Sequence, residues 1–106
     1  MISKDNSATG QLLNLLESRY AIRIVLALKD GHPQTFRLLQ DGVTGITPNT
    51  LNTRLKDLRT GGLVGHDGRG YVLTELGADL AKHIGDLPLF AAKWAAVLAQ
   101  DAPYIV

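Results

Sequence analysis

The stretch that decides the fold runs from residue 45 to residue 73 and reads GITPNTLNTRLKDLRTGGLVGHDGRGYVL. Near its start, Thr47 and Pro48 are typical of the cap and the first turn of a helix. The glycine pair at 61–62 is typical of a helix end, because glycine readily adopts the left-handed backbone found there. The sequence therefore predicts a helix over about residues 47–60.

The second half of this stretch has a period of two residues instead of 3.6. This period in Leu63–His66 and in Tyr71–Leu73 indicates two short strands. Between them lies Asp67–Gly70, whose glycines are typical of a tight turn. A β-hairpin is therefore predicted over about residues 63–73.

Apolar spacing predicts further helices on both sides of this unit. They are a first short helix carrying Leu12, Leu15 and Leu16, a central buried helix over Tyr20–Asp30, a third from Thr35 to Gly42, a fifth over Glu75–Ile84 and a sixth over Leu89–Ala99. Three short helices followed by a two-stranded hairpin are the order of a winged helix-turn-helix. In that motif the third helix enters the major groove of DNA, and here this is the helix predicted over about residues 47–60. The predicted class is mainly α with a small two-stranded β-hairpin, flanked by amino- and carboxyl-terminal dimerisation helices.

The composition fits one small domain. With 106 residues, 45% of them hydrophobic, the chain can build one core without a disulfide or a metal. We expect a polar leader over residues 1–8 and a single domain over residues 9–106, with the carboxyl-terminal helices at about 74–99. The chain has no cysteine, which excludes disulfides, thiolate metal sites and a thiol nucleophile.

The amino-terminal residues contain no apolar signal core, and no apolar run approaches the roughly 18 residues of a membrane span. We therefore expect a protein that is neither secreted nor embedded in a membrane. Its expected location is the cytoplasm, in association with the nucleoid.

The helix predicted over residues 47–60 has two different faces. A step of about 100° per residue places Leu51, Leu55 and Leu58 in one narrow arc, which can pack on the core. The opposite arc is polar and holds Asn49, Thr53, Lys56 and Thr60, with Asn52 and Asp57 on its flanks. Asn can pair with adenine, Thr can contact thymine, and Lys can contact phosphate or guanine, so this arc suits a DNA groove.

Any amphipathic helix turns polar residues to solvent, so this arc could also be ordinary surface. Two features favour DNA: Asn and Thr are mediocre helix formers, and the arc carries no Glu. Residues 46–70 are also the basic part of a chain whose formal net charge is only +1. The candidate DNA-binding residues are Thr47, Asn49, Thr50, Asn52, Thr53, Arg54, Lys56 and Arg69.

Several short motifs carry a family resemblance through their order and spacing. They are Tyr20–Gly31, Phe36, Gly45–Leu58, Gly62–Val64 and Tyr71–Gly77. Over about residues 12–94 the chain resembles the HxlR-type winged-helix regulators, within the wider MarR-like set. The resemblance implies a DNA-binding transcriptional regulator whose first and last helices pair across a two-fold axis to form a homodimer.

The chain departs from the family pattern in three places. Tyr20 stands where the family usually has Trp, and the segment between Val64 and Tyr71 is shorter than usual for the group. That shorter wing leaves Arg69 as its one strong cation. Some family members sense oxidants through a cysteine, and the absence of cysteine excludes such sensing here.

The apolar residues of the last predicted helix have two interpretations. Phe90 and Trp94 could be core, which is the usual meaning of aromatic residues at helical spacing. This helix follows a complete winged unit, however, and its apolar face is wider than one core can cover. We therefore expect a homodimer interface made by Leu12, Leu13, Leu16, Phe90, Trp94, Val97 and Leu98.

Other functions find little support in the sequence. His32, His66 and His83 are scattered and lack carboxylates at ligand spacing, so no metal is expected. His66 could contact a phosphate from the predicted wing, although a plain surface histidine is the better interpretation. With no Gly-x-Ser-x-Gly elbow and no glycine-rich phosphate loop, the chain is not expected to be an enzyme or to hold a cofactor. A small-molecule effector is compatible with the sequence, but no residue demands one.

The predicted function is therefore a transcriptional regulator that binds duplex DNA sequence-specifically, as a homodimer on an approximate inverted repeat. The alternative is a winged-helix module that binds a protein partner through the same polar arc, without specific DNA binding. Salt separates the two, because duplex binding weakens steeply as the salt concentration rises.

Overall fold

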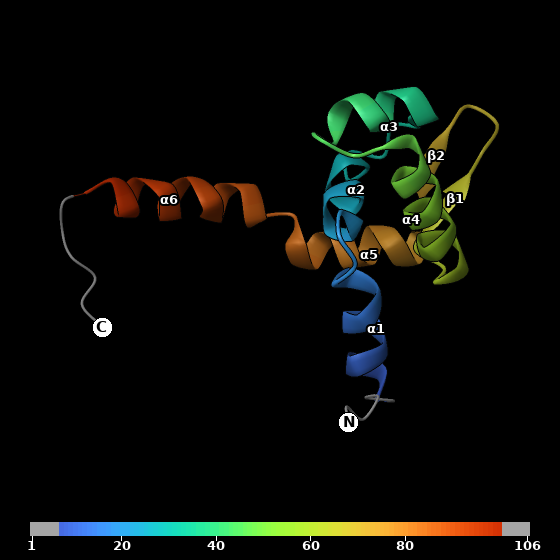
Figure 1. Cartoon of the computed structure of the whole chain (residues 1–106). Coiled ribbons are helices and arrows are strands. Elements are labelled where there is room, and N and C mark those ends of the chain that lie inside the picture. Colours follow the sequence, from blue (N-terminus) through green and yellow to red (C-terminus); the bar gives the residue numbers. More distant parts are fainter. Residues whose placement is uncertain (1–6, 101–106) are drawn as a thin grey trace.

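The structure, a computed structural model, describes residues 7–100 and shows a helical body with a β-hairpin on one side (Figure 1). Its elements are α1 (Ala8–Leu16), α2 (Ala21–Ala27), α3 (Phe36–Gly42), α4 (Pro48–Thr60), β1 (Val64–His66), β2 (Tyr71–Leu73), α5 (Glu75–Ile84) and α6 (Leu87–Ala99). The predicted fold class, mainly α with a two-stranded hairpin, is confirmed. Residues 1–6 of the expected leader and residues 101–106 of the expected domain lie outside the described residues.

The core lies where α2, α3, α4 and the hairpin meet. At its centre Ala21, Ile24 and Val25 of α2 are fully buried. The other buried apolar residues are Leu28, Leu39, Val43, Ile46, Leu51, Leu55, Leu58, Leu63, Val64 and Ala81. Each large side chain of this set contributes roughly 1.5–3 kcal/mol by leaving water, and together they hold α4 in place.

The central helix is shorter than the sequence predicts. The prediction of a helix over residues 20–30 is wrong at its end, because α2 stops at Ala27 and turns follow. The N–H of Gly31 bonds the carbonyl of Leu28, three residues back, and Gly31 then adopts a φ of +83°. Leu28 still packs into the core from this turn, so the apolar pattern extends beyond the helix.

Both ends of α4 were predicted; one threonine caps its start, and another binds the glycine turn that follows its end. At the start, the side-chain oxygen of Thr47 caps the helix and Pro48 occupies its first turn. After the end, the hydroxyl of Thr74 donates to the carbonyl of Gly62 at 2.6 Å. The same hydroxyl accepts a hydrogen bond from the N–H of Gly77 at 3.0 Å, so Thr74 joins the end of α4 to the start of α5.

The hairpin forms the wing beside α4. Its strands pair antiparallel, with Val64 opposite Leu73 and His66 opposite Tyr71. Gln34 adds an isolated bridge to Tyr71, which the sequence did not predict. The Tyr71 N–H donates to the Gln34 carbonyl at 2.7 Å, and the Gln34 N–H donates to the Tyr71 carbonyl at 3.0 Å. The wing is thereby attached to the segment before α3.

The last helix, α6, leaves the body on the side away from the wing (Figure 1). It starts at Leu87, before the predicted Leu89, and accommodates Pro88 in its first turn, where the missing N–H has no helical partner to lose. None of its residues is buried. Within residues 7–100, no helix has both the length and the apolarity needed to cross a membrane.

Candidate nucleic-acid interface

The outward face of α4 is exposed as predicted. Leu51, Leu55 and Leu58 are at most 2% exposed, which confirms that this stripe packs on the core. The exposed polar residues of the helix are Asn49, Asn52, Thr53, Lys56, Arg59 and Thr60. A continuous set of amide, hydroxyl and cationic groups therefore faces solvent along α4.

The threonines among the candidate residues are partly engaged within the helix. Thr47 accepts a hydrogen bond from the N–H of Thr50 at 3.2 Å and donates to its hydroxyl at 3.0 Å. The hydroxyl of Thr53 donates to the carbonyl of Asn49 at 3.0 Å. Thr53 therefore has its methyl group and its acceptor lone pairs left for an external contact.

Arg54 is held inside the chain rather than presented on the outward face. Its Nε donates to the carbonyl of Arg19 at 2.8 Å, and its Nη1 pairs with Asp57 Oδ2 at 3.3 Å. Its side chain is only 21% exposed. The contact with Arg19 joins α4 to residues 17–20, the segment between α1 and α2 that we call the junction.

A second contact joins the junction to the turn before α4. Tyr20 has a φ of 75°, which is rare for a residue with a side chain, and its hydroxyl donates to the carbonyl of Gly45 at 3.3 Å. The guanidinium of Arg19 lies over the Tyr20 ring, 4.8 Å from its centre. The aromatic residue at position 20 therefore helps to place the start of α4.

The tip of the wing carries the last candidate, Arg69. Its side chain is 77% exposed and pairs with Asp67 at 3.1 Å. The Arg69 backbone N–H, which donates to Asp67 Oδ1 at 2.9 Å, is the main cause that lowers the pKa of Asp67 below its usual value. His66 accepts from the Gly68 N–H at 3.3 Å and packs edge-on against Tyr71. His66 thus has a structural role in the wing.

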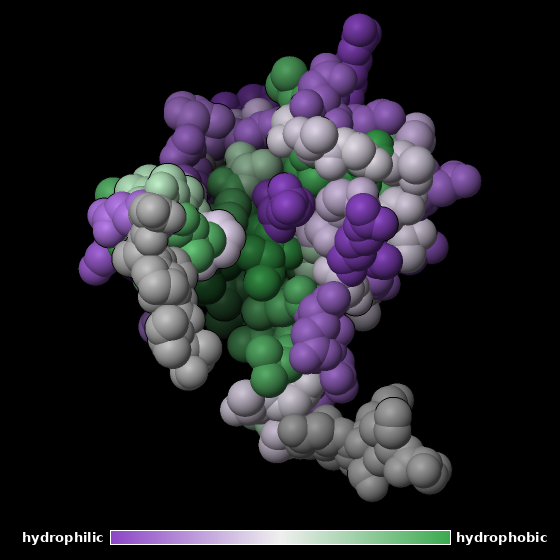
Figure 2. All heavy atoms as spheres, turned by 60° about the vertical axis from the view of Figure 1, so that its left-hand side comes forward, coloured by the Kyte–Doolittle hydropathy of each residue, from purple (hydrophilic) through white to green (hydrophobic). Residues whose placement is uncertain are grey.

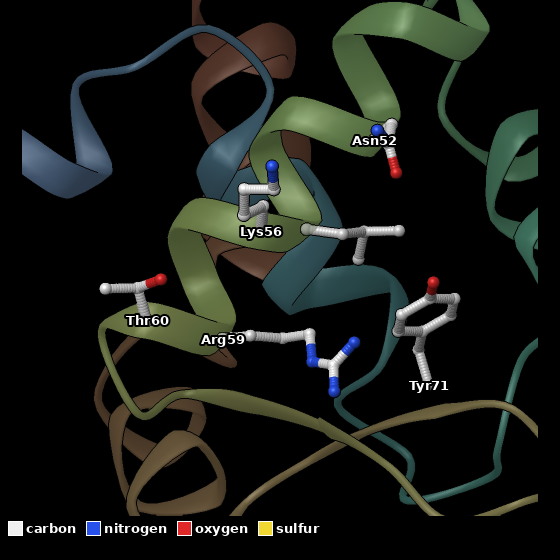
Figure 3. A pocket seen from close by; sticks show the side chains of 6 residues that line it. Asn52, Lys56, Arg59, Thr60 and Tyr71 are labelled. Atoms are coloured by element: carbon white, nitrogen blue, oxygen red, sulfur yellow. The ribbon is translucent and has the colours of Figure 1, made fainter.

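Arg59 of α4 and Tyr71 of β2, which are not among the candidate residues, lie at the side of α4 that faces the wing. A cleft of about 300 Å³ separates α4 from the wing (Figure 3). We call it the wing cleft; it is lined by Asn52, Leu55, Lys56, Arg59, Thr60 and Tyr71. Arg59 is one of the four cations in the basic segment 46–70, but no sequence signal places Tyr71 beside it.

The predicted dimer residues are largely exposed in the single chain. Phe90 and Trp94 are 59% and 56% exposed, so their alternative interpretation as core is wrong. Leu12, Leu13, Val97 and Leu98 are also exposed, and Leu16 is half-buried. Figure 2 shows a hollowed apolar surface over the body between α6 and α1.

The three histidines do not come together. His32, His66 and His83 are each exposed and lie on different elements or turns. In residues 7–100, no three His, Asp or Glu side chains form a cluster that could hold a metal ion.

The chain matches the family model described as HxlR-like helix-turn-helix over residues 15–99. A "possible HxlR family transcriptional factor" from Thermoplasma volcanium GSS1 superposes with a TM-score of 0.75 at 28% identity, covering 85% of this chain and 86% of that one. The quinone-bound YodB of B. subtilis gives a TM-score of 0.70 at 27% identity, covering 80% and 96%. A MarR family protein from Porphyromonas gingivalis W83 shares the fold, with a TM-score of 0.72 at 19% identity over 87% and 96% of the two chains. A comparison with curated proteins finds no match.

The matched region contains the whole helix-turn-helix, the wing and all of α6. The family and the solved neighbours are transcriptional regulators, which agrees with the expectation that the chain is not an enzyme. The chain therefore belongs to the HxlR-like helix-turn-helix family and is a DNA-binding transcriptional regulator.

Proposed function

We propose that the chain acts as a homodimer that binds duplex DNA at an approximate inverted repeat, with α4 in the major groove. The observation that carries this proposal is the outward face of α4. Its amide and hydroxyl groups are exposed along the helix, while the leucines of the opposite face anchor it to the core. A rigid helix with such a face can read base edges at fixed positions.

The candidate residues divide into two roles by their chemistry. Asn49, Asn52 and Thr53 offer groups that distinguish base edges, so they carry sequence preference. Lys56 and Arg69 carry charge, so they supply phosphate affinity that depends little on sequence. Arg54 supports both roles indirectly, because its contacts hold α4 against the junction.

The distribution of apolar surface supports the homodimer. Eight of the ten exposed large apolar residues in the described part of the chain lie on α1 and α6. A surface of this kind costs free energy in water, and a two-fold axis allows the same patch to cover itself. The two α4 helices of such a dimer would lie one DNA turn apart, about 34 Å, which corresponds to an inverted repeat.

Selection of bound duplexes from a random library, read at two salt concentrations, tests the proposal. The expected result is a site with two related half-sites, whose affinity falls steeply as salt rises. The alternative, a protein-binding module, would be supported if no preferred duplex is recovered and the chain instead binds a protein with an affinity that does not change with salt concentration.

Asn52→Ala then tests base reading on the selected site. The variant should lose about 1–3 kcal/mol on the preferred duplex and little on random duplex, since the bidentate pairing of an Asn amide favours one base, adenine. Glu75→Ala, on the exposed start of α5, is a matched control that should change neither affinity. An equal loss on both duplexes would contradict a base-reading role for Asn52.

A further inference from the structure

We propose that the wing cleft binds one phosphodiester of the DNA backbone, held by Arg59, Lys56 and the hydroxyl of Tyr71. The proposal rests on the proposed function and adds to it a defined contact between the reading helix and the wing. It also assigns a role to Arg59 and Tyr71, which the base-reading face of α4 does not use.

The distribution of ion pairs leaves two cations for this cleft. Of the four cations in residues 46–70, Arg54 pairs with Asp57 and Arg69 pairs with Asp67. Lys56 and Arg59 have no carboxylate partner within residues 7–100, and both line the wing cleft. Two positive charges with no internal partner in one cleft favour an anion there.

The cleft has a fixed wall on the wing side. The backbone of Tyr71 is held by both hydrogen bonds to Gln34, and its ring packs edge-on against His66 with centres 4.8 Å apart. Figure 3 shows the Arg59 guanidinium extending from α4 toward Tyr71. A phenol hydroxyl and a guanidinium on facing walls can donate to different oxygens of one phosphate.

The rim of the cleft indicates a phosphate that belongs to the DNA backbone. Leu55 lies at the floor and is only 2% exposed, so the polar side chains around it provide the accessible surface. Asn52 lines the cleft as well and stands on the outward face of α4. A backbone phosphate in the cleft would therefore lie next to the bases that the helix faces.

The first test measures the salt dependence of duplex binding by the full chain. Arg59→Ala should make the slope of log Kobs against log salt shallower by up to about one unit and weaken selected and random duplexes alike, because one of the two cations that hold the phosphate is lost. Arg59→Lys keeps the charge and should keep the slope. Lys82→Ala, an exposed cation on α5 outside the cleft, should leave both slope and affinity unchanged.

The second test locates the phosphate. Single methylphosphonate substitutions along the selected duplex should reveal, in each half-site, one position where neutralisation weakens wild-type binding by about tenfold. At that position Arg59→Ala should lose most of its sensitivity, with the remainder due to Lys56, and Tyr71→Phe, which removes only the hydroxyl, should lose a smaller part. Other positions should affect the wild type and both variants equally.

Three outcomes would overturn the proposal, and they are distinguishable. If the wild type binds no duplex, the proposed function fails and the cleft assignment fails with it. If the wild type binds but Arg59→Ala keeps the full slope and the full methylphosphonate profile, only the cleft assignment fails. If inorganic phosphate saturates the cleft in the absence of DNA while the profile of Arg59→Ala stays unchanged, the ligand is a free anion and not the DNA backbone.

Discussion

Replacing Trp94 with alanine should break the proposed dimer without unfolding the chain. Trp94 is 56% exposed on a helix that has no buried residue, so its truncation leaves the core of the winged unit intact. In the dimer the same indole would be covered by the partner. The variant therefore separates assembly from folding.

The size of the effect follows from the exposed area. An indole side chain has on the order of 200 Å² of surface, so the exposed 56% of Trp94 is roughly 110 Å². At about 25 cal/mol per Å², covering this area stabilises the dimer by roughly 3 kcal/mol per subunit, of which alanine retains a small part. Each subunit of a two-fold dimer contributes one Trp94, so the loss of free energy applies twice. The dissociation constant of the dimer should therefore rise by roughly a thousandfold or more.

Sedimentation velocity at low micromolar concentration measures this directly. Trp94→Ala should sediment as a monomer with wild-type helical circular dichroism, bind a two-half-site duplex poorly and retain weak half-site binding. Leu38→Ala is a matched control, since Leu38 is 53% exposed on α3 and lies outside the proposed interface. The reasoning is refuted if Trp94→Ala stays dimeric, or if it loses its helical signal without a monomer stage.

Two further substitutions test the placement of α4 and of the wing. Arg54→Ala should weaken binding to the preferred site while leaving the salt slope unchanged, because Arg54 positions α4 through Arg19 and does not itself contact phosphate. Titrations at three salt concentrations measure this slope. If the slope of Arg54→Ala is shallower than that of the wild type by about one unit, Arg54 contacts a phosphate and the prediction is wrong. Gly77→Ala should lower stability by about 1–3 kcal/mol in thermal melts, because the added Cβ would collide with the Leu63 carbonyl. An unchanged melting temperature would show that the turn between wing and α5 can relax.

Features set by local spacing were predictable from the sequence. Leu51, Leu55 and Leu58 repeat at helical intervals, and such a repeat fixes which face of α4 is buried wherever the helix packs. Thr47 is a cap because its side chain reaches an N–H three residues on, a distance within one turn. The outward face of α4 and the start of the helix could therefore be predicted without knowledge of any tertiary contact.

Features set by distant contacts were not predictable. The partner of Arg54 lies 35 residues earlier in the chain, so helical spacing could not show that this cation turns inward while Lys56 remains outward. The wing cleft depends on how β2 packs beside α4, which placed Tyr71 next to Arg59. For Phe90, spacing revealed an apolar stripe but not whether its own chain covers it.

The junction between α1 and α2 connects the proposed dimer interface to the position of α4. The Arg19 carbonyl accepts a hydrogen bond from Arg54, and the Tyr20 hydroxyl donates to the Gly45 carbonyl, so the junction connects the carboxyl end of α1 to α4. Each α4 would lie about 17 Å from the two-fold axis, half of one DNA turn, so a rotation of about 5° at the interface displaces it by roughly 1.5 Å. Repacking α1 would thus alter the preferred spacing between half-sites before it altered which bases are read.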